Sequence, residues 1–297
     1  MIRGAVVGGN VSKSRSPAIH AAAYKALGVE GQYDRHSVDS AGFRRLIEKL
    51  AAEGQSYVNV TIPHKRAAAD LADSASPVVK TMAAANTLIF RRVKGRAGHK
   101  DRFTVRAENT DGYGLVTALA DAAVVPQTGD KVVLLGSGGA AAGGLAALVA
   151  TGADIVLVAR RPGVAQALRR RFPPRTRTRI SVVPWTGLAL AEALRGAVAL
   201  VSSVPADVFA EAGANAGLEA LERSTAVLEM AYGDQTPLGR FVQSRRGRYQ
   251  DGLPMLVHQA ARAIELVLGD LPPTAPLMRA ARRPPRPTPS AAAIEVR

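Results

Sequence analysis

The sequence predicts an α/β protein with two domains, the second of which is a doubly wound parallel sheet. Three observations support this prediction. Short apolar runs alternate with helical patterns along the chain, which is the order of elements in α/β layers. The chain has 297 residues, whereas one hydrophobic core seldom grows beyond about 250 residues. In the second half, a glycine-rich turn follows an apolar run and opens a helix of small residues.

The first domain begins with a strand and a capped helix. The helix is predicted over residues 17–27, because Ser16 suits the N-cap and Pro17 suits the first helical position. In chain order we expect a strand at 2–8, this helix, a helix at 43–52, strands at 57–60 and 87–91, a hairpin turn at 94–100, a returning strand at 103–105 and a helix at 111–122.

The second domain repeats strand and helix more regularly after a punctuated linker at 125–130. Its strands are predicted from continuous apolar runs, which are typical of strands buried on both faces of a parallel sheet. They are expected at 131–135, 154–159, 180–183, 199–203 and 226–230, with a turn at 136–139, a helix at 140–150 and a last helix at 257–268.

Composition excludes several classes of protein. The chain has no cysteine, which excludes disulfide scaffolds, thiolate nucleophiles, cysteine-bound zinc and iron–sulfur clusters, and we expect no metal site. The first residues run directly into an apolar strand without a signal-peptide pattern, and no apolar run reaches membrane-spanning length. We therefore expect a cytoplasmic protein with no membrane partner.

The positive charge of the chain raises a nucleic-acid hypothesis. Lys and Arg total 39 against 24 Asp and Glu, a formal net charge of +15, and much of the excess lies at 169–179 and 279–286. Nucleic-acid sites usually interleave aromatic side chains with basic ones to stack bases, but aromatic residues make up 4% of this chain. A solvated basic surface is the favoured interpretation, and a nucleic-acid site is the alternative.

The glycine turn of the second domain matches the dinucleotide-binding fingerprint. Gly136 allows the tight turn, Gly138 lets backbone N–H groups approach a pyrophosphate, and Ala141 packs the helix on the strand. A turn that is merely rich in glycine would not explain the regular strands on either side. We therefore expect a Rossmann-like domain whose cofactor contacts include Gly136, Ser137, Gly138, Gly139 and Ala140.

The end of the following strand indicates which nucleotide binds. NAD sites place an acidic residue about 20 positions after the turn, where it accepts a hydrogen bond from the ribose 2′-hydroxyl. Here Arg160 and Arg161 take that place, and guanidinium groups suit a 2′-phosphate. NADP(H) is therefore the predicted cofactor, although a solvent-facing role is nearly as good an interpretation of Arg161, which precedes Pro162.

Three polar groups of residues stand out from the apolar framework of the first domain. They are the segment 14–17, the polar turn 59–65 after a strand, and Asn86 together with 109–112. Each has a structural explanation by itself, since Ser16 and Asp111 could simply cap helices. Lys65 follows a strand at the carboxyl edge of the expected sheet, where ligands of α/β proteins bind. Together these residues predict a pocket for a small polyhydroxylated molecule.

Six segments, in this order, resemble motifs of the shikimate dehydrogenase family: SRSPAIH at 14–20, NVTIPHK at 59–65, ANTL at 85–88, NTDG at 109–112, GSGGA at 136–140 and DGLPMLVHQA at 251–260. The resemblance covers roughly residues 5–268. It implies reversible NADPH-dependent reduction of 3-dehydroshikimate to shikimate, in the shikimate pathway to chorismate and the aromatic amino acids.

The resemblance also implies roles for single residues. Lys65 and Asp111 match the catalytic pair, in which Lys65 supplies a proton to the growing alkoxide and Asp111 orients it. Ser14 and Ser16 match the residues that bind the substrate carboxylate. The other residues expected near the substrate are Asn59, Thr61, Asn86, Tyr232 and Gln259, and those expected near the cofactor are Ser203, Val204, Gly252 and Met255.

The chain departs from the family pattern in three places. The usual Asn-Arg-Thr after the second strand is Ala-Arg-Arg at 159–161, which keeps the central Arg. The frequent Asn-Ala-Thr is absent around 201–205, and the segment 230–238 keeps its Tyr and Thr-Pro-Leu but is shortened between them. Met255 could equally belong to the core of the last helix.

We therefore expect four parts of the chain: a substrate-binding and catalytic domain at 1–112, an NADP-binding domain at 113–250, a C-terminal helix at 251–270 that packs back on the substrate domain, and a disordered Pro/Arg-rich tail at 271–297. The expected protein acts on a small molecule as a monomer or a homodimer. Two alternatives remain: a quinate/shikimate dehydrogenase that prefers NAD, and a non-catalytic relative of the same fold.

Overall fold

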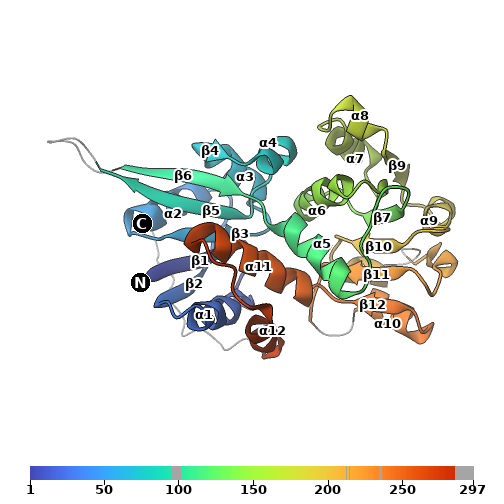
Figure 1. The fold of residues 1–297 in the computed structure, drawn as a ribbon. Coiled ribbons are helices and arrows are strands. Elements are labelled where there is room, and N and C mark those ends of the chain that lie inside the picture. The colour runs from blue at the N-terminus through green and yellow to red at the C-terminus, as the bar shows by residue number, and fades with distance from the viewer. Residues whose placement is uncertain (95–101, 212, 214, 234–235, 285–297) are drawn as a thin grey trace. The chain divides into compact units, whose positions relative to one another are not determined.

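A computed structural model describes residues 1–94, 102–211, 213, 215–233 and 236–284. The chain divides into two compact units (Figure 1). The first contains Met1–Ala75, Ala85–Glu108 and the chain from Ala263 onward, and the second contains Ser76–Ala84 and Asn109–Arg262. The domain limits at residues 112 and 250 stay predictions. Among the described residues, no helix combines the length and the apolar character needed to cross a membrane.

The first unit is built on a mixed sheet of six strands. Their order is β2-β1-β3-β5-β6-β4, with β2, β1 and β3 parallel and β5 antiparallel to both of its neighbours. The strands are β1 (Ile2–Gly8), β2 (Gly31–Ser37), β3 (Tyr57–Val60), β4 (Ser74–Ala75), β5 (Thr87–Val93) and β6 (Arg102–Glu108). The helices of this unit are α1 (Ser16–Ala26), α2 (Phe43–Ala52), α3 (Lys65–Leu71) and α12 (Thr274–Arg282).

The second unit confirms the predicted doubly wound parallel sheet. All its strand pairs are parallel, in the order β12-β11-β10-β7-β8-β9, which reverses direction between β7 and β10 (Figure 1). The strands are β7 (Lys131–Leu135), β8 (Asp154–Ala159), β9 (Ile180–Pro184), β10 (Ala199–Ser202), β11 (Ala226–Glu229) and β12 (Arg248–Gln250). Nucleotides bind at such a reversal, outside the carboxyl ends of the strands.

The strands of the second sheet are buried on both faces. Along β7, Val132 and Leu134 belong to one hydrophobic cluster, while Val133 and Leu135 belong to another. This division follows from the two-residue period of a strand. Residues of α4 (Pro77–Met82), α5 (Asp111–Asp121), α6 (Gly139–Ala150) and α7 (Pro162–Arg169) contribute to the first cluster, and those of α9 (Gly187–Leu194) and α10 (Pro237–Ser244) contribute to the second.

The short connecting helices and the last long helix complete the described elements. They are α8 (Pro174–Arg177), the 3₁₀ turns η1 (Ala206–Ala210) and η2 (Leu218–Ala220), and α11 (Leu253–Leu268). Helix α11 is divided between the units, because Arg262 ends the second unit and Ala263 continues the first. It begins four residues earlier than the start predicted from apolar periodicity, at 257.

Two predictions for the first unit were wrong. Ser16 is the first residue of α1 and not its N-cap, because the preceding Arg15 already has helical angles (φ −85°, ψ −8°), whereas a capping residue is extended. The stretch predicted as a disordered tail contains α12, since Leu277 and Ala281 are one turn apart and both fully buried. Residues 285–297 and most of the predicted hairpin turn at 94–100 lie outside the described residues.

Candidate functional site

Lys65 lies just beyond the carboxyl end of β3, as its position after a strand predicted. The chain leaves β3 at Val60 and reaches α3 at Lys65 through a turn in which the Thr61 N–H donates to the Val7 carbonyl, 2.9 Å away. The ring of His64 stacks on Phe43, with centroids 4.6 Å apart. The carbonyl of Lys65 accepts from the Ala85 N–H at 2.8 Å. This half-buried lysine therefore has a fixed backbone beside the start of the next polar segment.

Ser14 and Ser16, which the resemblance assigns to the substrate carboxylate, lie together at the start of α1. The Ser14 hydroxyl donates to the Ser16 hydroxyl oxygen at 3.1 Å and accepts from the Ser16 N–H at 3.2 Å. The Arg35 guanidinium donates to the Ser14 carbonyl through Nε at 3.1 Å and through Nη2 at 2.6 Å. Two hydroxyls, a helix N-terminus and a guanidinium thus lie together, and each of these groups favours a carboxylate.

A chain of buried hydrogen bonds joins Asn59 and Asn86 across neighbouring strands. The Tyr33 hydroxyl donates to Asn59 Oδ1 at 2.7 Å, and Asn59 Nδ2 donates to the Thr87 hydroxyl oxygen at 3.0 Å. Thr87 in turn donates to Asn86 Oδ1 at 3.0 Å. Both predicted substrate amides are therefore held by fixed partners, which limits the rotamers available to them.

Tyr33 connects this chain to the paired serines and was not predicted as a site residue. Burial raises its pKa well above the ordinary value, and the charge of Tyr24 adds to the increase, while a side-chain hydrogen bond with Ser16 opposes it. The same hydroxyl therefore interacts with both Asn59 and Ser16. No sequence pattern indicates this role, because residues 31–37 contain no apolar run and β2 was not predicted.

A second buried group of polar rings packs beside Tyr33. His20 stacks on it with centroids 3.8 Å apart, and His20 Nδ1 lies 2.5 Å from the Tyr57 hydroxyl, which is 2.7 Å from the Tyr24 hydroxyl. Burial lowers the pKa of His20 to about 3 and raises that of Tyr24 to about 12. These rings stay uncharged near neutral pH, and His20 packs directly on Tyr33, which bonds Asn59.

In the second unit, the glycine turn has the geometry that the fingerprint requires. Gly136 has φ +103°, which side chains rarely adopt, and a Cβ there would lie 2.5 Å from Ser203 Oγ. Gly138 has extended angles at the N-cap of α6, and a Cβ on it would meet no atom within 4 Å. The space above Gly138 and the N–H groups of α6 therefore form a cradle suited to a pyrophosphate.

Ser203 and Arg160 lie at the carboxyl ends of β10 and β8, the two strands that flank β7 in this sheet. The Ser203 hydroxyl and its N–H both donate to the Leu135 carbonyl, at 2.6 and 3.0 Å, and this holds the segment with Val204 against the glycine turn. Arg160 and Arg161 follow β8 and are exposed. Arg160 forms an ion pair with Glu211, and Arg161 is the N-cap residue of α7.

Asp111 lies at the start of α5, where the helix dipole favours a carboxylate. It is buried, with 5% of its surface exposed, and its N–H donates to Asn109 Oδ1 at 3.0 Å. Asn109 is itself fixed by donating to the Ala84 carbonyl at 2.9 Å. Gln259 on α11 accepts a long hydrogen bond of 3.5 Å from the neighbouring Thr110 hydroxyl. The structure thus brings these residues together within the second unit.

Strand β11 ends in a buried carboxylate that was not predicted as a site residue. Glu229 is fully buried, and its Oε2 accepts from the Tyr249 hydroxyl at 2.8 Å and from Thr236, which also caps α10. Burial raises the pKa of Tyr249. The segment with Tyr232 therefore starts and ends at one hydrogen-bonded cluster.

Gly252 and Met255 lie at the start of α11. A Cβ on Gly252 would lie 2.1 Å from the Met230 carbonyl oxygen, so only glycine fits this approach. The Met255 side chain is buried in the cluster that contains Leu115, in accord with the core interpretation of this residue. Its expected contact with the cofactor stays a prediction.

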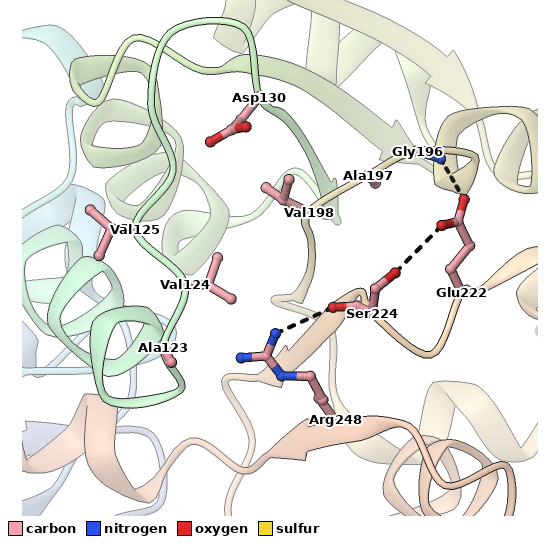
Figure 2. A pocket seen from close by; sticks show the side chains of 10 residues that line it. All are labelled: Ala123, Val124, Val125, Asp130, Gly196, Ala197, Val198, Glu222, Ser224 and Arg248. Carbon is pink, nitrogen blue, oxygen red and sulfur yellow. Dashed lines mark hydrogen bonds between the residues drawn. The ribbon is translucent and has the colours of Figure 1, made fainter.

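A pocket of about 350 Å³ lies at the amino ends of strands of the second sheet, opposite the carboxyl ends where the glycine turn lies (Figure 2). Its lining includes Asp130 before β7, Val198 before β10, Ser224 before β11 and Arg248 at the start of β12, together with residues 123–125 after α5. Arg248 donates to the carbonyls of Ser224, at 3.4 Å, and of Ala122. Because the glycine turn and Ser203 follow carboxyl ends, this pocket is separate from the candidate cofactor site.

The predicted site residues thus form two local sets, one in each unit. Ser14, Ser16, Asn59, Thr61, Lys65 and Asn86 belong to the first unit, and Asp111, Tyr232, Gln259 and all predicted cofactor residues belong to the second. Asn59 and Asn86 are joined by hydrogen bonds, and so are the two serines.

Comparison with known proteins assigns the family. The family model described as the shikimate dehydrogenase substrate binding domain matches residues 6–88. The chain is 35% identical over 280 residues to the NADP(+) shikimate dehydrogenase of Dinoroseobacter shibae, covering 93% of this chain and 95% of that protein. It is 34% identical to the enzyme of the same name from Acidovorax sp. strain JS42, covering 93% and 94%.

Solved structures agree with the sequence comparison. The shikimate 5-dehydrogenase of Thermus thermophilus, solved with NADP(H) and shikimate, matches with a TM-score of 0.80 and 29% identity over 95% of this chain and 99% of that one. The Mycobacterium tuberculosis shikimate dehydrogenase matches with a TM-score of 0.79 and 31% identity over 95% and 99%. The extent of these similarities, together with the two sets of site residues, shows that the chain belongs to the shikimate dehydrogenase family.

Proposed function

We propose that the protein catalyses the reversible reduction of 3-dehydroshikimate to shikimate with NADPH. The observation that supports this most is the hydrogen-bonded set of Ser14, Ser16, Asn59 and Asn86 in the first unit. Hydroxyls and amides on fixed partners suit a small ring that has several hydroxyls and one carboxylate. Homologues with the name of NADP(+) shikimate dehydrogenase, covering nearly the whole chain, support the same reaction.

The second unit fits NADP(H). The positive φ of Gly136 and the space above Gly138 leave room for a pyrophosphate at the N-terminus of α6, and the exposed Arg160 suits a 2′-phosphate. When bound, NADPH supplies the hydride that the substrate carbonyl receives. We assign the cofactor contacts predicted from the sequence to this turn, to Ser203 and Val204, and to Gly252 and Met255.

The residues of the chain account for binding and proton transfer. Ser14 and Ser16 bind the substrate carboxylate, and Asn59, Thr61 and Asn86 contact its hydroxyl groups, with Tyr232 and Gln259 as further contacts. As the carbonyl oxygen at C3 gains negative charge, the Lys65 ammonium donates a proton to it. Asp111 orients this lysine, and the charge of Lys65 stabilises the developing alkoxide before the proton moves. In the oxidative direction, neutral Lys65 takes the proton back.

Kinetics with paired substrates and cofactors test the proposal. Initial rates of nicotinamide reduction are measured with shikimate and with quinate, each combined with NADP⁺ and with NAD⁺. We expect the highest kcat/KM for shikimate with NADP⁺. A higher value for quinate or for NAD⁺ would contradict the biosynthetic assignment and favour a quinate/shikimate dehydrogenase, and no turnover with any pair would indicate a non-catalytic relative.

The remaining expectations from the sequence are also proposals. We place the enzyme in the cytoplasm, as a monomer or a homodimer, and expect no nucleic-acid partner. Retention on heparin that falls steeply with salt would contradict the last of these, because counterion release makes nucleic-acid binding strongly dependent on salt.

A further inference from the structure

Arg160 has a carboxylate partner in the structure. Its Nη1 lies 3.1 Å from Glu211 Oε2 and 3.3 Å from Oε1, so the guanidinium faces both oxygens. The two side chains are 57% and 59% exposed. Glu211 follows β10 by way of η1, 51 residues beyond Arg160 in the chain, so sequence inspection around the strand end could not find it.

The backbone on both sides of this pair is anchored in the second unit. Ala159, just before Arg160, is buried, and its carbonyl accepts from the Trp185 N–H at 3.1 Å. Phe209, two residues before Glu211, is 1% exposed and packs against the Trp185 ring with centroids 5.7 Å apart. The Glu211 N–H donates to the Val208 carbonyl at 3.2 Å. The fixed backbones keep the two side chains within reach of each other.

We propose that Glu211 is a specificity-determining residue that competes with the 2′-phosphate of NADP(H) for Arg160. The proposal rests on the proposed function, because it assumes that Arg160 binds this phosphate. The Glu211 carboxylate and the phosphate are both anions that a guanidinium binds through the same N–H donors. NADP(H) binding therefore has to break the ion pair with Glu211 or accept a negative charge beside the phosphate.

NAD(H) makes no such demand. It carries a 2′-hydroxyl in place of the phosphate, so Arg160 can keep its carboxylate partner when NAD(H) binds. A carboxylate near this position can also accept a hydrogen bond from the ribose, as the acidic residue of NAD sites does. Glu211 thus weakens the binding of NADP(H) but not that of NAD(H), and it reduces the preference for NADP(H) that Arg160 creates.

Cofactor binding to the whole chain tests the proposal without relying on turnover. Dissociation constants for NADP⁺ and NAD⁺ are measured by calorimetry for wild type, Glu211→Gln and Asp207→Asn. The control removes the same charge from an exposed residue four positions earlier, in η1, that takes no part in the Arg160 pair. A third variant, Arg160→Gln, measures what Arg160 contributes.

We expect Glu211→Gln to tighten NADP⁺ binding by about two- to fivefold, the size typical of an exposed ion pair. Asp207→Asn should change it less, and neither variant should tighten NAD⁺ binding. In the Arg160→Gln background the effect of Glu211→Gln should shrink, because the competing groups share that arginine.

Three outcomes would contradict the inference. Unchanged NADP⁺ binding in Glu211→Gln would show that the carboxylate does not compete. Weaker binding would show that Glu211 positions Arg160 for the phosphate. Equal tightening of NADP⁺ binding by Asp207→Asn would show that the effect comes from the loss of one negative charge and not from the pair with Arg160. In each case the proposed function survives if wild type binds NADP⁺; wild type that binds neither nucleotide would contradict the proposed function itself.

Discussion

The predicted substrate residues of the first unit and the predicted cofactor residues of the second unit are built in different ways. In the first unit, the predicted substrate residues Asn59 and Asn86 are buried side chains joined through Thr87 and supported by Tyr33. In the second unit, the cofactor turn offers backbone at Gly136 and Gly138 and exposed charge at Arg160 and Arg161.

The difference teaches where selectivity resides in each unit. A buried network of hydrogen bonds recognises its ligand through side-chain positions, so a lost hydroxyl disturbs both binding and stability. A glycine turn recognises its ligand through backbone shape, so an added methyl group disturbs it, while an exposed charge can change with little cost in stability.

The largest expected effect is that of Lys65→Ala on turnover. Loss of a positioned proton donor should lower kcat by about 10²–10⁴-fold. KM for shikimate should change little, because the remaining polar residues bind the substrate. Steady-state kinetics measure both parameters. Arg66→Ala is the matched control on the same helix, since Arg66 lies in an exposed pair with Asp70, and near wild-type kcat in Lys65→Ala would contradict the assigned role.

The second largest effect is expected for Gly136→Ala, which should lower both the stability of the chain and its affinity for NADP⁺. The variant forces alanine into φ +103° and places its Cβ 2.5 Å from Ser203 Oγ, so we expect a loss of about 1–3 kcal/mol in the free energy of unfolding. Urea denaturation and NADP⁺ titration measure the two effects. Gly138→Ala separates them: because its Cβ meets no protein atom, it should keep stability and weaken only NADP⁺ binding.

His20 should make the first unit sensitive to acid. Its pKa in the folded chain is about 3, below the ordinary value of 6.5. Between these pH values, His20 is therefore protonated in the unfolded chain and neutral in the folded chain. Stability from this group is complete above pH 6.5 and falls by about 1.4 kcal/mol per pH unit as the pH drops toward 3.

Urea denaturation at pH 7 and pH 5 measures this effect in wild type and in His20→Gln. The variant has its own cost in stability at both pH values, so the comparison is between the two pH dependences. We expect a smaller loss on acidification in His20→Gln. An equal loss in both proteins would show that His20 is not the group responsible.

Tyr33→Phe should have the smallest effect, and one that divides between binding and stability. It removes the hydroxyl that donates to Asn59 and interacts with Ser16, for which we expect a loss of about 0.5–1.5 kcal/mol in stability. KM for shikimate should rise, while KM for NADP⁺ should stay unchanged. The control Tyr24→Phe removes a hydroxyl that is bonded to Tyr57 instead. An equal rise in KM for shikimate in Tyr24→Phe would contradict a specific role of Tyr33 in substrate binding.

The fold was most predictable where apolar runs are continuous. Strands β7 and β8 were predicted at their observed limits, because a continuous apolar run follows the charged first residue of each strand. Strands β2 and β12 were missed, since residues 31–37 and 248–250 are mostly polar and pair at or near sheet edges. Helix α12 was missed because its neighbouring prolines suggested disorder, whereas buried Leu277 and Ala281 stabilise it.

Sequence motifs predicted which residues belong to the candidate site, but they did not predict the side chains that bond to those residues. The resemblance of the segment 14–20 to a family motif identified Ser14 and Ser16, and the structure joins them by a hydrogen bond. The partners of these residues come from distant segments: Tyr33 reaches Asn59 across 26 residues, and Glu211 reaches Arg160 across 51. No pattern in a single sequence indicates such pairs, because they depend on which strands become neighbours in the folded sheets.

The most direct test of the central claim is to follow the reductive reaction to its product. The purified chain is given 3-dehydroshikimate and NADPH, the loss of NADPH is followed by absorbance, and the product is identified by chromatography with mass spectrometry. We predict that shikimate accumulates in equal amount to the NADPH consumed, and that Lys65→Ala slows both together. Absence of NADPH consumption, or a product other than shikimate, would contradict the account.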